Sequence, residues 1–248
     1  MNNGNEPSGA SGSLLLYGMR YSVYLRIARV VLAEKGLSYQ HIEVNPVLPN
    51  MPQEYLELHP FRRVPTLVHD SFVLYETGAI TRYVDEQFAG PSLQPTESRH
   101  RARMAQIISI VDCYGYTPMV RQVHFNRVFG PRIGQPVNEA QVTAGIKGSE
   151  LALDAFEAIA STDGPLAGGE IWSLADFHLA PMMAYFTAAP EGGEALRRHP
   201  KLTAWWNAVC QRPALRDTDP GLPDGLASFI NPCTGRTSAS ERPLPGLP

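Results

Sequence analysis

Apolar and polar positions in the first ninety residues change their spacing several times. The run LLLY at 14–17 predicts a buried strand that Gly18 ends, and apolar residues recur at helical spacing over 23–31 until Gly36 closes the helix. A weaker alternation over 39–44 predicts a second strand. Strand, helix and strand in this order are typical of a βαβ unit.

Two further strands follow in the same part of the chain. TLVH at 66–69 and FVLY at 72–75 are separated by only two residues, which predicts a tight hairpin. Apolar residues at helical spacing then indicate a helix over 77–88, with Thr77 as the cap of its exposed N–H groups. We therefore expect residues 13–88 to form one α/β domain.

The rest of the chain has a helical pattern. Two prolines and a glycine in 89–96 are typical of a linker, and we place a helical domain at 97–216. Apolar residues three and four positions apart predict its helices over 98–127, 138–159, 174–186 and 202–211. Repeated prolines argue against regular helices in the tail, 217–248, which we expect to be extended or disordered. The polar residues 1–12 are predicted to form a loose arm.

Composition narrows the functional classes. The 248 residues are 44% hydrophobic and 18% charged, as in ordinary globular proteins. A net charge of −3 gives no strong field for nucleic acid or an anionic membrane, and no apolar run approaches the ~18 to 20 residues of a membrane span. We expect neither partner.

The cysteines and the N-terminus point to one compartment. Cys113, Cys210 and Cys233 are widely spaced, with no CxxC motif and no nearby histidine to suggest a metal site, so we predict none. The first residues lack the basic and apolar segments of a secretory signal. The prediction is reduced thiols in a cytoplasmic protein.

Pro65 directly precedes an apolar strand, so it is expected at the start of that strand. If the Val64–Pro65 bond is cis, the N–H and C=O of Val64 become free to pair with an extended peptide ligand. An ordinary trans proline in a loop is the alternative, and the residues alone leave both open.

Candidate ligand-binding residues stand at the N-termini of two predicted helices. The pair Glu76-Thr77 lies before the helix over 77–88, where helix N–H groups and the Thr77 hydroxyl suit a ligand carboxylate and Glu76 suits an ammonium group. Ser22 begins the first helix, where a hydroxyl and the positive helix end can stabilise a thiolate. Tyr21 and Tyr24, and more remotely Tyr17, are alternative donors. Simple helix capping also explains both groups.

The order and spacing of four segments resemble the cytosolic glutathione transferase family. They are 18–36, HPFRRVPTL at 59–67, LYETGAITRYV at 74–84 and SLADFHLAPMMAYF at 173–186, and the resemblance covers roughly Leu14 to Arg216. It implies a thioredoxin-like N-terminal domain followed by an all-helical C-terminal bundle. The proline and acidic motifs look phi-like, and the subclass implies a serine as the residue that bonds the sulfur.

The resemblance also implies roles for individual residues. Val64, before the cis-proline Pro65, would pair with the cysteinyl part of glutathione, and Glu76-Thr77 would hold its γ-glutamyl end. Ser22 matches the serine that bonds the sulfur. Arg63, where many members have glutamine, and the flanking Tyr21 and Tyr24 depart from the pattern. The residues expected on the long helix beside the electrophile pocket are Tyr114, Tyr116, Met119, His124 and Phe125.

The implied activity is transfer of glutathione, as co-substrate, to a hydrophobic electrophile in detoxification, by a protein that is usually a homodimer. A glutathione-dependent isomerase, dehalogenase or ether-cleaving enzyme of the same fold stays open, as does a non-catalytic glutathione-binding module. The resemblance further implies an N-terminal capping box formed by Ser173 and Asp176.

Overall fold

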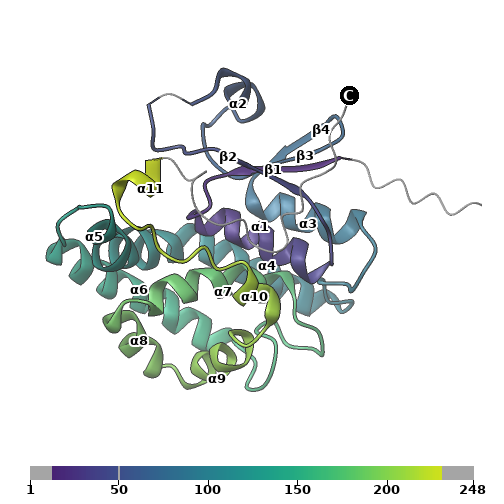
Figure 1. The fold of residues 1–248 in the computed structure, drawn as a ribbon. Helices are drawn as coiled ribbons and strands as arrows, with labels where there is room; N and C mark the ends of the chain where they lie inside the picture. Colours follow the sequence, from purple (N-terminus) through teal and green to yellow (C-terminus); the bar gives the residue numbers. More distant parts are fainter. Residues whose placement is uncertain (1–12, 50, 231–248) are drawn as a thin grey trace, which may run out of the picture.

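The computed structural model describes residues 13–49 and 51–230 (Figure 1). Its first part is a four-stranded sheet in the order β2-β1-β3-β4, in which β1 pairs parallel with β2 and antiparallel with β3, and β3 pairs antiparallel with β4. Figure 1 shows α1 and α3 between this sheet and the later helices, with α2 on the other side of the sheet. The bounds are β1 Leu14–Gly18, α1 Val23–Glu34, β2 Gln40–Glu43, α2 Gln53–Leu58, β3 Thr66–His69, β4 Phe72–Tyr75 and α3 Thr77–Gln87.

The predicted strands and the first helix are confirmed. β1 alternates between buried and half-buried residues, and α1 packs against α3 and α7. Ser22 is the N-cap of α1, and Gly36 follows its C-cap with φ +68°, the left-handed conformation that favours glycine.

Two details of this domain differ from the sequence prediction. Thr77 is the first residue of α3, and the cap is Glu76, whose side chain makes no capping hydrogen bond. The helix α2 lies in a proline-rich stretch that gave no helical pattern, and its one buried residue is Tyr55. The Tyr55 hydroxyl donates to the carbonyl oxygen of Arg63 at 2.5 Å and lies 3.0 Å from the Thr66 hydroxyl, so a single anchor holds this short helix against the sheet.

The second part of the chain is helical, as predicted, with one unusual element. The predicted helix over 98–127 consists of α4, Ser98–Ile110, followed by the π-helical stretches η1, Val111–Gly115, and η2, Thr117–Phe129. The remaining bounds are α5 Gly130–Arg132, α6 Glu139–Ile159, α7 Leu174–Thr187, α8 Pro190–Arg197, α9 Pro200–Val209, α10 Pro213–Asp217 and α11 Leu226–Ile230. The wider turn of a π-helix changes which residues share a face.

Close packing against α7 and α6 holds the helical domain together. Almost every residue of α7 is buried, so this helix forms the centre of the bundle. Gly145 of α6 lies where a Cβ atom would come within 2.8 Å of the Pro118 carbonyl oxygen of η2, so only glycine allows this approach. The predicted capping box is present: the Ser173 N–H donates to Asp176 Oδ2 at 2.7 Å, and both arms of the box are made.

The tail contains a helix where we expected none. After α10 the chain runs along the junction of the two domains and forms α11, whose Phe229 is buried against Phe129 and Tyr21. Burial of one aromatic side chain supplies the free energy that the local composition does not. The predicted arm over 1–12, the end of the tail over 231–248 and Cys233 lie outside the described residues.

Some sequence expectations concern absences. Within 13–49 and 51–230, no helix is long and apolar enough to cross a membrane. The same residues hold no cluster of three or more histidine, cysteine or acidic side chains suited to a metal ion. Cys113 and Cys210 are free thiols.

Candidate active site at the edge of the sheet

The predicted site residues meet because three strand ends lie side by side. Tyr17 of β1 pairs with Thr66 of β3, and Thr66 pairs with Tyr75 of β4. The residues next along each strand, Gly18, Pro65 and Glu76, therefore lie at one edge of the sheet. The chain leaves β1 at this edge and enters α1 at Ser22, so 22, 64–65 and 76–77 come to the same region.

The Val64–Pro65 peptide bond is cis, which decides between the two alternatives that the sequence left open. Pro65 is buried, Val64 is half-buried, and the ladder between β3 and β4 begins only at Thr66. The peptide groups of Val64 therefore lie outside the sheet ladder, where an extended peptide can pair with them. Arg63 is exposed, and its backbone is fixed by the bond from the buried Tyr55 hydroxyl.

Glu76 has an unusual backbone conformation. Its φ is +69°, the left-handed region that a non-glycine residue rarely adopts, and its side chain is exposed. Strain of this kind persists where surrounding structure imposes it, often at ligand sites. Thr77, which is 6% exposed, follows as the first residue of α3. The side chain of Glu76 makes no hydrogen bond to the helix N–H groups. The first N–H groups of α3 therefore suit an anionic ligand group.

Ser22 keeps its hydroxyl proton available. Its side-chain oxygen accepts a hydrogen bond from the Leu25 N–H at 3.4 Å, as an N-cap does. A serine hydroxyl donates through its own proton while its oxygen accepts, so capping and donation to a ligand sulfur are compatible. Ser22 is half-buried at the positive end of α1.

The two neighbouring tyrosines point elsewhere. Burial is the main cause that raises the pKa of Tyr24, and the nearby Asp112 carboxylate adds to it. Its ring lies 4.9 Å from that of Tyr116. The Tyr21 ring packs 5.5 Å from Phe129, and burial is again the main cause that raises its pKa. Both phenols are weaker acids than a free tyrosine.

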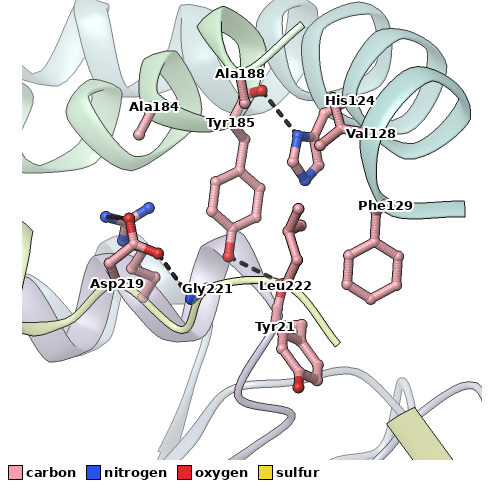
Figure 2. A pocket seen from close by; sticks show the side chains of 11 residues that line it. Tyr21, His124, Val128, Phe129, Ala184, Tyr185, Ala188, Asp219, Gly221 and Leu222 are labelled. Carbon is pink, nitrogen blue, oxygen red and sulfur yellow. Dashed lines mark hydrogen bonds and ion pairs between the residues drawn. The ribbon is translucent and has the colours of Figure 1, made fainter. Parts of the chain in front are cut away.

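The long helix presents only some of the residues that we expect beside the electrophile pocket. Met119 is completely buried in the core, so it is not on the wall of an open pocket, and Tyr114 is 63% exposed on the surface. The same helix presents the expected His124, together with Val128 and Phe129, to a cavity of about 170 Å³ between the domains (Figure 2). The resemblance places the expected residues on this helix without saying which side each one faces, and the π-helical turns of η1 and η2 are wider than those of an α-helix.

Comparison with known proteins gives a consistent result. A family model described as "Glutathione S-transferase, N-terminal domain" matches residues 16–92, and one described as "Glutathione S-transferase, C-terminal domain" matches 139–208. Glutathione S-transferase F10 of Arabidopsis thaliana is 30% identical over 193 residues, which cover 77% of this chain and 89% of that protein. The chain belongs to the glutathione S-transferase family.

Further relatives place the chain within the family. Glutathione S-transferase F13 of Arabidopsis thaliana is 29% identical over 213 residues, 85% of this chain and 96% of that protein. The solved structure of glutathione S-transferase III in its apo form has a TM-score of 0.73 at 28% identity, covering 96% of this chain and all of that chain, 100%. The predicted phi-like member and its two-domain fold are confirmed. As a glutathione transferase, the chain is an enzyme that uses glutathione as its co-substrate.

The glutathione transferase fold also brings together residues that sequence analysis missed. Oδ1 of Asp112, in η1, lies 2.9 Å from Nε2 of His178, in α7. The side chain of His178 is completely buried. His59, 1% exposed, has its ring 4.8 Å from that of Tyr75 at the same sheet edge, and burial is the main cause that lowers its pKa. No spacing signal links Asp112 to a residue so far along the chain.

Proposed function

We propose that Ser22 activates the thiol of glutathione and that the thiolate attacks a hydrophobic electrophile held against the helical domain. The observation that carries this proposal is the position of a serine hydroxyl at the N-terminus of α1, on the sheet edge that also bears the cis Val64–Pro65 bond. Glutathione is a tripeptide with carboxylates and an ammonium group, and this edge offers a partner for each.

The docking of glutathione follows from those partners. The N–H and C=O of Val64 pair with the cysteinyl part, which holds the sulfur near Ser22. Glu76 balances the ammonium of the γ-glutamyl end, while Thr77 and the first N–H groups of α3 bind its carboxylate. Arg63, which is exposed beside this groove, supplies a positive charge.

Ser22 is a better candidate than either tyrosine. Burial and the nearby Asp112 carboxylate raise the pKa of Tyr24, and Tyr21 packs among phenylalanines, whereas the Ser22 proton is available. Each unit by which the thiol pKa falls corresponds to about 1.4 kcal/mol of preferential binding of the thiolate. A hydrogen bond to an anion contributes about 1.5 to 3 kcal/mol, so one serine and a helix end suffice for one to two units.

The test measures the thiol pKa of bound glutathione and the conjugation rate for an aryl halide. We expect Ser22→Ala to raise that pKa by about one unit or more and to lower kcat/KM about tenfold or more. Tyr24→Phe is the matched control, which removes one hydroxyl two residues away, and both quantities should stay as in the wild type. Unchanged values in Ser22→Ala would remove the proposed role.

Product analysis separates the related activities. An isomerase returns glutathione unchanged, and a hydrolytic dehalogenase releases halide and regenerates glutathione when water attacks the intermediate conjugate. An ether-cleaving enzyme leaves glutathione bonded to carbon and releases an alcohol or phenol, which identifies it among the products. Accumulation of a stoichiometric conjugate supports transfer, whereas tight glutathione binding with no turnover over aryl halides, epoxides and peroxides supports a binding module.

The electrophile is proposed to bind beside Tyr21, on the side away from Glu76. Tyr21 packs with Phe129 of η2 and Phe229 of α11, so the residue before Ser22 borders an aromatic surface. Tyr114 stays a predicted contact for a large electrophile. A Tyr114→Ala variant with altered KM only for bulky substrates would support that contact.

We also propose a homodimer located in the cytoplasm. Phe61 is 65% exposed and lies against the rings of His59 and Tyr75, and an exposed aromatic group of this kind suits a subunit interface. Light scattering should give twice the mass of the chain, and Phe61→Ser should shift it towards the monomer. The free thiols of Cys113 and Cys210 fit a reducing compartment, which cell fractionation tests.

A further inference from the structure

A surface groove lies where η2 and α5 meet the N-terminal end of α6. Its volume is about 490 Å³, and its lining includes apolar side chains and amide groups. It shares no lining residue with the cavity between the domains, where Nδ1 of His124 lies 2.8 Å from the Tyr185 carbonyl oxygen. Tyr21 and Phe129, which we assign to the electrophile, do not line the groove. The groove is therefore a separate surface.

The apolar side chains of the groove are accessible. Pro136 and Val137 are exposed, Val137 by 39%, and Phe125 is half-buried. An apolar cavity of about 150 Å³ holds one benzene molecule, so this groove has room for about three groups of that size. Its size suits a short segment with several apolar side chains better than one small molecule.

Two amide side chains of the groove have hydrogen-bond donors to offer. Oδ1 of Asn138 accepts from the Gln141 N–H at 3.1 Å as the N-cap of α6, and its Nδ2 has no partner among the described residues. The side chain of Gln135 likewise bonds no described residue. The Asn126 amide, in contrast, donates to two carbonyl oxygens of its own helix, at 2.9 and 3.1 Å. Donors of this kind suit a ligand backbone that is rich in acceptors and poor in N–H groups.

The tail runs close to this groove at its last described helix. The Phe229 ring of α11 lies 5.6 Å from that of Phe129, and Gly130, which lines the groove, directly follows Phe129. Arg132 of α5 donates to the Pro223 carbonyl oxygen at 3.3 Å. Figure 1 shows α11 beside α5. The chain that continues from α11 therefore starts next to the groove.

The sequence beyond α11 ends in a segment with matching chemistry. Residues 242–248 read RPLPGLP, in which two leucines are apolar and three prolines have no N–H. Proline-rich backbones favour the polyproline II conformation, whose carbonyl oxygens have no internal partner, and such segments dock in grooves lined by aromatic side chains. Residues 231–241 can span up to about 35 Å when extended, so they are long enough to let 242–248 reach the groove.

We propose that residues 242–248 dock in the groove of the same molecule. Their leucine and proline side chains pack against Phe125 and Val137, and their carbonyl oxygens accept from Gln135 and Asn138. Because the segment is attached to the chain, its effective concentration at the groove is on the order of millimolar. Docking also fixes the chain on both sides of α11, in which Phe229 is the one described side chain that is buried.

Competition with an added peptide tests the docking. A fluorescent peptide of sequence RPLPGLP is titrated with the full chain, and binding is measured by fluorescence anisotropy. The attached segment excludes the peptide about tenfold if its own Kd is about 0.1 mM. We therefore expect the combined substitutions Leu244→Asp and Leu247→Asp, which release the attached segment, to raise the affinity for the peptide about tenfold or more. Ser238→Asp with Ser240→Asp is the matched control, because it adds the same charge outside the segment and should leave the affinity as in the wild type.

A further substitution locates the peptide on the groove. In the chain with Leu244→Asp and Leu247→Asp, Val137→Asp should abolish peptide binding. Leu151→Asp is its matched control, because Leu151 is also an exposed apolar residue near or in α6, at 73% exposure, but does not line the groove. Glutathione affinity should be the same in every variant, which shows that each one is folded.

Three outcomes would overturn the proposal. The first is a chain with Leu244→Asp and Leu247→Asp that binds the peptide no better than the wild type. The second is peptide binding that Val137→Asp leaves unchanged. The third is exclusion of the peptide from the wild type only at high protein concentration, because the segment then docks on a second copy of the chain and not on its own groove.

Discussion

The buried, neutral His124 should make the chain lose stability as the pH falls. Its pKa is about 4 in the folded chain, mainly because of burial, against 6.5 for the free side chain. The charged groups that face it oppose each other, since Arg26 lowers this pKa and Asp219 raises it. Between these two pH values the unfolded chain binds a proton that the folded chain does not, so protonation favours unfolding.

The magnitude follows from the two pKa values. The stabilising contribution is present above pH 6.5 and is lost as the pH falls towards 4, with a total of about 3 kcal/mol. More than half of the interval between pH 6.5 and pH 4 lies above pH 5. The loss of stability between pH 7 and pH 5 is therefore about 2 kcal/mol. This is a large part of the 5 to 15 kcal/mol typical of a domain.

Urea unfolding at pH 7, 6 and 5 provides the assay, with His124→Gln as the comparison. Glutamine can still donate to the Tyr185 carbonyl oxygen but does not titrate, and every other group titrates alike in both proteins. We expect the free energy of unfolding of the wild type to fall about 2 kcal/mol further than that of the variant between pH 7 and pH 5. Parallel curves for the two proteins would refute the assignment of a neutral, buried imidazole.

Three further predictions concern stability and binding. Asp176→Ala should lower the free energy of unfolding by about 3 kcal/mol or more in urea, because three buried N–H groups lose their acceptor, whereas Trp205→Phe removes one of these donors and should cost only about 1 kcal/mol. Gly192→Ala should destabilise the chain, since its Cβ would lie 2.0 Å from the Phe186 carbonyl oxygen, while Gly193→Ala in the same helix is open and should raise the melting temperature slightly. Glu76→Gln should weaken glutathione binding about tenfold in calorimetry with kcat almost unchanged, and an unchanged Kd would remove the ammonium contact.

The sheet edge could be predicted because its signals are local. A glycine after an apolar run, a proline before one and a helix start after a hairpin each mark the end of a strand, and pairing of neighbouring strands brings these ends together. Ser22, Pro65 and Glu76 are therefore found by position in the sequence. The isomer of the Val64–Pro65 bond was not decided in this way, because general proline frequencies favour trans.

The residues of the long helix that face the cavity could be predicted only in part. His124, expected beside the electrophile pocket, lines the cavity, whereas Met119 is buried in the core. Residues 111–115 and 117–129 form π-helix, so a spacing of 3.6 residues does not say which of them share a face. Phe229 packs against Tyr21, although the two residues are more than two hundred positions apart in the sequence. Phe229 lies in a segment whose prolines argue against a helix. Only tertiary contacts determine both features.

The tyrosines beside Ser22 explain how a departure from the family pattern leaves the chemistry intact. Ser22 is the N-cap, where its side chain turns back to the N–H groups of α1, while Tyr21 lies before the helix and Tyr24 within its first turn. The three side chains consequently leave the backbone in different directions, Tyr21 towards α11 and Tyr24 towards η1. Large residues at these positions shape the walls on either side of the thiol without competing for its proton. We therefore propose that Tyr21 and its phenylalanine neighbours set the electrophile range and that Ser22, with the N-terminal end of α1, sets the thiol pKa, so variants at Tyr21 and Ser22 should change different kinetic parameters.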